Sequence, residues 1–285
     1  MCVARRNFLS LAPHANFNHH EGVVRLATRC TASQVLIAIK QGVLDLFAHK
    51  EDVHLWFNDC DQDVCLAIWL MQHAERVSGV KSEPLISRLA YIVDMMDTCG
   101  GAFPIDPASR IMEEMCWIFE PYTSARTEGR IATFYVSETL TTIEAVCARI
   151  SAYAMADGKR LKPDFRFEVI RDGLGWKMVW ELGNDARTAL RVAGVKAFVS
   201  IRSYHEEMKV CHANIGRFTP YTDFPLDQIY ARLNEAEGIS DGCMERWGGS
   251  DTIGGSPRSK GSNLSPEEIG NTISTFMRTR TDRQD

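Results

Sequence analysis

The hydrophobic and polar positions divide the chain into two parts with different patterns. In the first part, apolar residues recur at the helical spacing of three to four, with Val35, Leu36 and Ile39 as one example. This spacing predicts helices over residues 31–40, 64–74, 84–96, 111–119 and 138–156. A short run rich in β-formers predicts a strand over residues 53–57, and the polar stretch 122–129 predicts an irregular connection.

The second part alternates short β-type segments with turn residues. It predicts strands over residues 165–171, 176–182, 197–202 and 208–214, with helices over residues 184–192 and 225–237. A last helix is predicted to begin near Ser265, because Ser265, Pro266 and Glu268 form a capping-box pattern.

These patterns predict an α/β fold with two domains. The polar run 157–164 is typical of a linker, so we place the N-terminal domain at residues 1–160 and a smaller α/β C-terminal domain at residues 161–285. The N-terminal domain is expected to hold a mostly parallel sheet flanked by helices, with polar turns at the carboxyl ends of its strands.

Composition narrows the classes of protein that fit the chain of 285 residues. The formal net charge of −5 provides no basic surplus, which argues against tight binding to long duplex nucleic acid. We find no apolar window long enough for a membrane span and no secretory signal at the N-terminus. The nine cysteines include no CxxC pair, which argues against a zinc ribbon and favours a reduced, cytoplasmic protein.

Three polar turns are the strongest candidates for chemistry. They are Asn18-His19-His20-Glu21, the alternating Asp59, Asp61 and Asp63, and the pair Asp94 and Asp97. If the preceding segments share one sheet, the turns converge at one edge. Imidazole with carboxylates suits Mn²⁺, Fe²⁺ or Zn²⁺, and two such ions could activate water and hold a phosphoryl group.

Each turn also has a purely structural interpretation. The histidines can lie in a surface turn, the aspartates at 59–63 can cap a helix N-terminus, and Asp97 can end a helix before Gly100. His54 is predicted to lie in the core, whereas the roles of His14, His205 and His212 stay open.

A glycine-rich segment near the C-terminus is the candidate substrate loop. It contains neither a P-loop motif nor GxGxxG, so any anion would contact backbone N–H groups, Ser256 or Arg258. The alternative interpretation is a flexible loop.

The motifs together resemble the DHH phosphoesterase superfamily. Asn18-His19-His20 is similar to its Asp-His-His signature, Phe57 to Asp61 to its strand ending in Asp-x-Asp, and Asp97-Thr98 to its later Asp-Thr turn. Trp247 to Ser250, with Gly254 and Gly255, is similar to the glycine-rich loop of its C-terminal domain. Two features depart from that pattern: Asn18 replaces the signature aspartate, and the Asp-x-Asp turn follows the histidines.

The resemblance implies a divalent-metal site on the N-terminal domain, with Mn²⁺ expected first and Mg²⁺, Fe²⁺ or Zn²⁺ as alternatives. The implied metal ligands are His19, His20, Asp59, Asp61 and Asp97. The implied substrate-binding residues are Gly249, Ser250, Gly254, Gly255, Ser256 and Arg258. His20, Glu21 and Asn18 are the expected catalytic residues, with Glu21 able to supply the charge that Asn18 lacks.

The expected function is metal-dependent hydrolysis of a phosphate ester or phosphodiester. The expected substrate is a nucleotide, another small phosphate ester or a short oligonucleotide, closed in by the C-terminal domain. A non-catalytic binding protein on a similar scaffold, or a biosynthetic metal enzyme such as a lyase or amidohydrolase, are the alternatives. A homodimer is compatible with the sequence, and no membrane partner is expected.

Overall fold

The computed structural model describes residues 15–19, 23–47, 53–101, 103–131, 135–240 and 242–281. The chain divides into two compact units. The first contains Met1–Thr98 and Ala108–Pro163, and the second contains Cys99–Pro107 and Asp164–Asp285. The second unit is therefore discontinuous in sequence.

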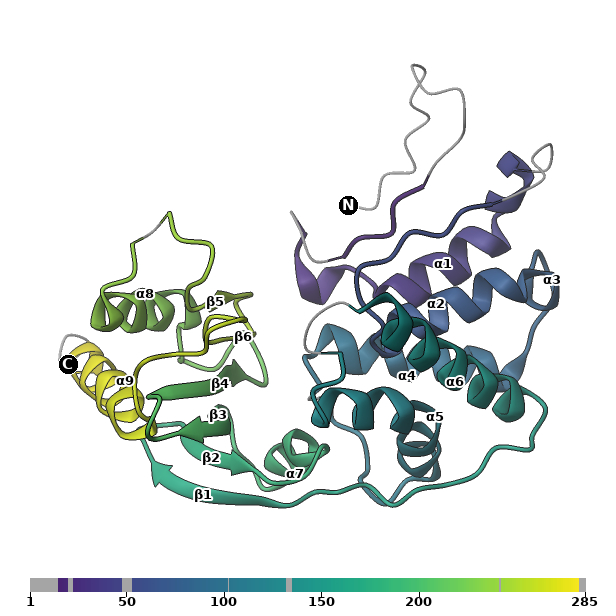
Figure 1. Cartoon of the computed structure of the whole chain (residues 1–285). Coiled ribbons are helices and arrows are strands. Elements are labelled where there is room, and N and C mark those ends of the chain that lie inside the picture. Colours follow the sequence, from purple (N-terminus) through teal and green to yellow (C-terminus); the bar gives the residue numbers. More distant parts are fainter. Residues whose placement is uncertain are drawn as a thin grey trace. The chain divides into compact units, whose positions relative to one another are not determined.

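The described part of the first unit is helical (Figure 1). Its elements are η1 (Arg25–Ala27), α1 (Thr31–Lys40), η2 (Val43–Phe47), α2 (Gln62–Gln72), α3 (Ala74–Val77), α4 (Pro84–Thr98), α5 (Arg110–Thr127) and α6 (Val136–Ala154). The predicted helices at 31–40, 64–74, 84–96 and 138–156 are thereby confirmed, with ends displaced by at most two residues. None of the described helices is both long and apolar enough to cross a membrane.

Helix α2 lies at the centre of this unit. The residues from Cys65 to Leu70 are all buried, which is typical of a helix that is apolar around its whole circumference. It packs against α1, α4 and α6. The indole Nε1 of Trp69 donates a hydrogen bond of 2.8 Å to the Ser151 hydroxyl on α6. These contacts hold α2 between α1, α4 and α6.

The parallel sheet predicted for the N-terminal domain is wrong for the described residues. The segment 53–57 forms no strand there, and Trp56 is 94% exposed. A strand needs a partner to pair its N–H and C=O groups, and β-type composition alone does not provide one. His54, predicted to lie in the core, is exposed.

Helix α5 continues through the stretch 122–129 that was predicted to be irregular. Pro121 lies inside it and has no N–H to donate to the carbonyl of Trp117 one turn earlier. Arg149 on α6 replaces that donor, because its Nη1 lies 2.5 Å from the Trp117 oxygen. Its Nη2 also contacts the Glu120 carboxylate at 2.6 Å. The contact from Arg149 on α6 therefore satisfies the carbonyl that lacks a helical donor, and α5 continues beyond Pro121.

We expect Arg149→Met to lower the free energy of unfolding by about 1–3 kcal/mol, because the Trp117 carbonyl loses its donor. In a Pro121→Ala background the helix supplies its own N–H, so the same substitution should cost less. Urea unfolding of the four proteins in this double-mutant cycle measures the difference. Equal costs in both backgrounds would contradict the bridging role.

The second unit is built on a six-stranded sheet with the order β1-β2-β3-β4-β6-β5. Its elements are β1 (Phe167–Asp172), β2 (Lys177–Glu181), α7 (Ala186–Val192), β3 (Ala197–His205), β4 (Val210–Arg217), α8 (Leu226–Glu237), β5 (Gly248–Gly249), β6 (Ile253–Gly255) and α9 (Pro266–Thr281). Strands β2 and β3 are parallel and joined through α7, whereas the other pairs are antiparallel. The fold is thus mixed α/β, but the sheet is mostly antiparallel rather than mostly parallel.

Helices cover both faces of this sheet. On one face, Val199 and Ile201 of β3 pack with Ile229 of α8 and Ile273 of α9 in one hydrophobic core. On the other face, Phe198 packs with Leu190 of α7. Alternating side chains of β3 therefore contribute to two cores, as strand geometry requires.

The predicted capping box of the last helix is confirmed. The Ser265 hydroxyl accepts the N–H of Glu268 at 3.2 Å, and the Glu268 carboxylate accepts the N–H of Ser265 at 2.8 Å. The N–H and the hydroxyl of Ser265 both donate to the Glu268 carboxylate and lower its pKa. The reciprocal backbone and side-chain bonds fix the start of α9.

Candidate metal centre

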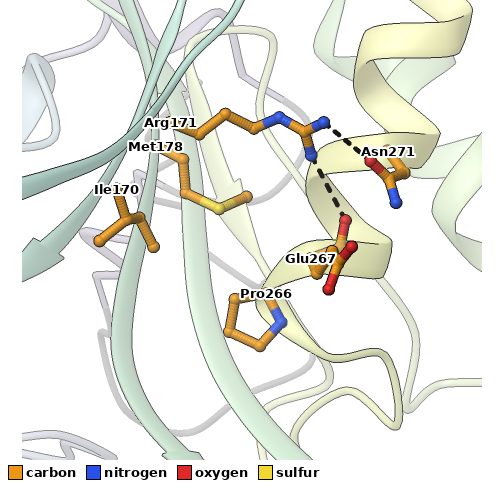
Figure 2. A pocket seen from close by; sticks show the side chains of 6 residues that line it. All are labelled: Ile170, Arg171, Met178, Pro266, Glu267 and Asn271. Atoms are coloured by element: carbon orange, nitrogen blue, oxygen red, sulfur yellow. Dashed lines mark hydrogen bonds between the residues drawn. The ribbon is translucent and has the colours of Figure 1, made fainter.

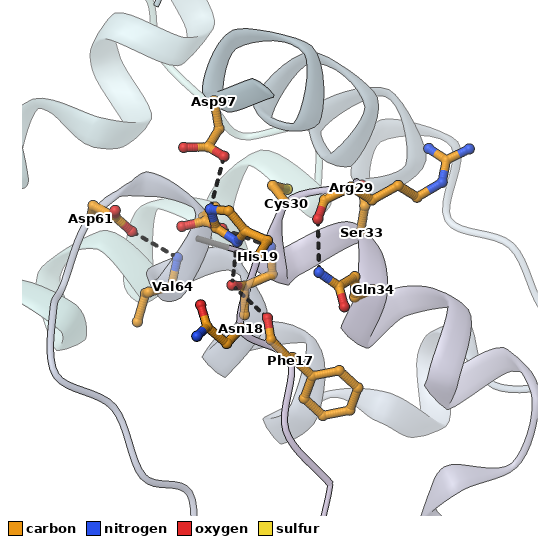
Figure 3. A network of polar contacts seen from close by, with 12 residues as sticks. Phe17, Asn18, His19, Arg29, Cys30, Ser33, Gln34, Asp61, Val64 and Asp97 are labelled. Atoms are coloured by element: carbon orange, nitrogen blue, oxygen red, sulfur yellow. Dashed lines mark hydrogen bonds and ion pairs between the residues drawn. The ribbon is translucent and has the colours of Figure 1, made fainter. Parts of the chain in front are cut away.

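His19 is the residue around which the candidate site forms. It lies in the extended segment before α1 and is only 2% exposed. Its Nδ1 lies 2.9 Å from the Thr31 hydroxyl at the first position of α1. That hydroxyl donates to the Phe17 carbonyl at 3.2 Å. The imidazole is thereby tied to the start of α1 (Figure 3).

Two aspartates from other helices lie against this imidazole. The Nε2 of His19 lies 3.1 Å from Asp97 Oδ2, near the end of α4, and Nδ1 lies 3.6 Å from Asp63 Oδ2, in the first turn of α2. One ligand atom from each residue lies within 4.8 Å of the others. We call His19, Asp63 and Asp97 the three-residue cluster.

The electrostatics of the cluster favour a cation. Asp63 is 2% exposed, and burial, with the negative charges of Asp61 and Asp97, raises the pKa of its carboxyl to about 9. The N–H of Thr31, which donates to Asp63 at 2.8 Å, acts in the opposite direction. A bound divalent ion would offset the negative charge of the Asp63 and Asp97 carboxylates, which the fold places close together.

Asp61 and Asp59 lie outside the three-residue cluster. Asp61 is the N-cap of α2 and accepts the N–H of Val64 at 3.1 Å, which is the structural interpretation considered for this turn. Asp59 is exposed, and its Oδ1 accepts the N–H of Cys60 at 2.7 Å. Their predicted role as metal ligands stays a prediction, whereas Asp63, absent from the predicted ligand set, is in the cluster.

Asp94 ties α4 to the residues that precede α1. It is 1% exposed and accepts a 2.7 Å hydrogen bond from the N–H of Cys30. The guanidinium Nη1 of Arg29 donates to its other oxygen at 2.9 Å. The neighbouring Cys30 thiol is fully buried, and burial, with Asp63 nearby, raises its pKa above the ordinary value. Asp94 thus holds in place the helix that supplies Asp97.

The remaining residues of the histidine motif contribute less to the described structure. Asn18 is exposed, and its N–H donates to Asn16 Oδ1 at 3.0 Å. His14, His20 and Glu21, which include two of the three predicted catalytic residues, lie outside the described residues.

The predicted glycine-rich substrate loop forms an edge hairpin of the sheet. Gly249 pairs with Gly254, and Gly255 pairs with Asn214 of β4. Gly249 has φ +153°, and a Cβ at Gly254 would collide with the Tyr230 hydroxyl, so the fold itself requires glycine at both positions.

The polar residues of the hairpin already have partners in the backbone. The Ser250 hydroxyl bonds within its own turn, accepting the N–H of Ile253 at 3.1 Å, and the Ser256 hydroxyl accepts the N–H of Ala213 at 3.2 Å. Arg258 and His205 are exposed, and His212 is half-buried on β4. The phosphate-binding role of these residues stays a prediction.

A pocket of about 370 Å³ lies in the second unit, against β1, β2 and the start of α9 (Figure 2). The side chain of Arg171 lines this pocket and bridges β1 and α9. Its Nη2 donates to Asn271 Oδ1 at 2.7 Å, and its Nη1 donates to the Glu267 carbonyl at 3.4 Å. These contacts fasten α9 to β1, so we assign the arginine a structural role.

The sequence placed Asp63 in a candidate turn but not in the predicted ligand set, and it gave Thr31 no role beyond the start of a helix. An N-cap at Asp61 puts Asp63 in the first turn of α2, and this signal could have favoured Asp63, whereas no sequence signal marks Thr31.

Comparison of the chain with protein-family models, curated proteins and solved structures gave no match. The candidate function therefore depends on the geometry of the three-residue cluster.

Proposed function

We propose that this protein is a divalent-metal-dependent hydrolase of small phosphate esters. The observation that carries the proposal is the three-residue cluster, in which a buried imidazole and two carboxylates from three separate segments bring ligand atoms within 4.8 Å. Burial and neighbouring acids disfavour the charged form of Asp63, as its raised pKa indicates, and a bound cation would offset this cost.

The donor set fits the proposed metal. One nitrogen and carboxylate oxygens suit Mn²⁺, Fe²⁺ or Zn²⁺, and we propose Mn²⁺ first because oxygen donors predominate. Three protein ligands leave coordination positions for water and substrate, as in catalytic metal sites. The Asp97 side chain is 24% exposed, whereas His19 and Asp63 are nearly inaccessible, so the substrate would approach from the Asp97 side.

The three residues of the cluster would hold the ion from different sides. When bound, the ion would supply Lewis-acid chemistry that polarises a phosphoryl oxygen. His19 and Asp63 would hold the ion from the buried side, and Asp97 from the side open to solvent. His20 and Glu21 directly follow His19 in the sequence, so we assign to them the transfer of protons to and from the substrate.

The resemblance to DHH phosphoesterases is part of this proposal. Its support is that His19 and Asp97, both carried over from the motifs, belong to one cluster. Within the proposal the substrate is a nucleotide or short oligonucleotide, and the protein acts in the cytoplasm.

A metal-binding protein without hydrolytic activity is the second candidate. It is favoured by Asn18, which is exposed and has a neutral carboxamide where the signature has a carboxylate. A carboxamide binds or bridges metal ions less well than a carboxylate.

The test uses the full chain, freed of metal and then supplied with Mn²⁺. We expect hydrolysis of at least one member of a panel of p-nitrophenyl phosphate, bis-p-nitrophenyl phosphate, nucleoside monophosphates and dinucleotides. His19→Gln should reduce the rate by about a hundredfold or more. Tight Mn²⁺ binding with no hydrolysis would support the second candidate, and absence of Mn²⁺ binding would overturn both.

A further inference from the structure

We propose that Thr31 is the positioning residue of the candidate metal centre. Its hydroxyl fixes which nitrogen of His19 faces the ion, and its backbone N–H holds the Asp63 carboxylate. The inference rests on the proposed metal centre, although part of its test needs no metal. A single residue at the start of α1 would then orient two of the three ligands.

The position of one proton follows from the hydrogen bonds of the Thr31 hydroxyl. A hydroxyl has one hydrogen to donate, and the carbonyl of Phe17, at 3.2 Å, can only accept. When the hydroxyl hydrogen is directed at Phe17, the 2.9 Å contact between the hydroxyl oxygen and His19 Nδ1 is made by Nδ1–H, which donates to that oxygen. In the neutral imidazole this leaves the lone pair on Nε2, the nitrogen that lies 3.1 Å from Asp97.

Metal-ligating histidines commonly donate their second ring N–H to a protein acceptor, which fixes the tautomer and the orientation of the ring. Thr31 would be that acceptor for His19. The hydroxyl can accept the N–H of His19 because it donates its own hydrogen to the Phe17 carbonyl. The orientation of His19 therefore depends on the hydrogen bonds of Phe17 and Thr31 together.

The second action of Thr31 comes from its place at the helix start. The first N–H groups of a helix have no partner within it, and the helix dipole favours a carboxylate there. The N–H of Thr31 donates to Asp63 at 2.8 Å, which holds that carboxylate beside the imidazole. Substitution of the side chain leaves this contact in place, so the two actions can be separated.

The experiment compares Thr31→Val and Thr31→Ser with the unmodified full chain. Thr31→Val keeps the shape and backbone N–H but removes the hydroxyl, and Thr31→Ser keeps the hydroxyl. Thr142→Val is the matched control, because it removes a buried hydroxyl that donates to the Glu138 carbonyl within α6 at 2.8 Å.

Two quantities are measured. Long-range ¹⁵N–¹H NMR of the metal-free proteins at neutral pH reports the tautomer of His19, whose signals are assigned with His19→Gln. Titration with Mn²⁺ reports affinity. We expect the Nδ1–H tautomer in the unmodified chain, in Thr31→Ser and in Thr142→Val. Thr31→Val should lose this preference and bind Mn²⁺ about 10–100-fold more weakly, the range for such supporting contacts.

Each outcome decides the inference. It is overturned if Thr31→Val retains the Nδ1–H tautomer, if its Mn²⁺ affinity matches that of Thr142→Val, or if Thr31→Ser fails to restore both. If the unmodified chain binds no Mn²⁺, that result contradicts both the proposed metal centre and the proposed role of Thr31. If the tautomer and the affinity change as expected while no phosphate ester is hydrolysed, the inference stands and the proposed hydrolase function fails.

Discussion

Asp63→Asn is expected to weaken Mn²⁺ binding by about a hundredfold or more, since loss of a ligand should exceed the 10–100-fold effect of supporting residues. Asparagine keeps an oxygen that can accept the N–H of Thr31, so the start of α1 is preserved. It removes the buried negative charge that would face the cation. Isothermal titration of the metal-free protein, or electron paramagnetic resonance of free Mn²⁺, measures the change.

The matched control is Asp59→Asn in the same turn. Asp59 is exposed and lies outside the three-residue cluster, so we expect the affinity to stay within about threefold, a change of less than 1 kcal/mol. The reverse result, with Asp59 essential and Asp63 dispensable, would assign the ion to the ligands implied by the motif resemblance. Thermal unfolding without metal should show that both variants remain folded.

Trp69→Ala is expected to lower the free energy of unfolding by about 3–5 kcal/mol, the range for deleting a large buried aromatic residue. Its side chain is fully buried in α2, stacks on His73 with ring centroids 4.4 Å apart, and donates to Ser151 on α6. The deletion would therefore leave a cavity and an unpaired hydroxyl. Urea unfolding followed by far-ultraviolet circular dichroism at the helix band measures the loss.

Trp56→Ala provides the control with the same chemical change. Trp56 is 94% exposed, so its removal should change the free energy of unfolding by no more than about 0.5 kcal/mol. Similar effects for the two tryptophans would show that α2 is not the centre of the core.

The helices of the first unit were predictable because their apolar residues repeat at a local period. The same reasoning failed at residues 53–57, since pairing between strands depends on a distant partner that composition does not reveal. It also ended α5 too early, because the guanidinium that satisfies Trp117 comes from Arg149 on another helix. Each error concerns a contact that joins segments far apart in the sequence.

The candidate site was predictable as a set of residue types but not as a set of positions. His19 and Asp97 were both expected to bind metal, and their atoms are 3.1 Å apart. The aspartates at 59, 61 and 63 could not be ranked from their spacing, because burial separates them: Asp59 is exposed, whereas Asp63 is 2% exposed. The part played by Thr31 follows only from hydrogen-bond directions, which no motif encodes.

The discontinuity of the second unit affects any attempt to divide the protein. The chain passes from one unit to the other after Thr98, after Pro107 and after Pro163. The short piece Cys99–Pro107 belongs to the sheet unit, where the Gly100 carbonyl accepts Arg187 Nη1 at 3.2 Å. Genetic excision or proteolysis at one peptide bond therefore cannot release two complete units: a cut at residue 163 leaves this piece, and the anchor of Arg187, on the helical fragment.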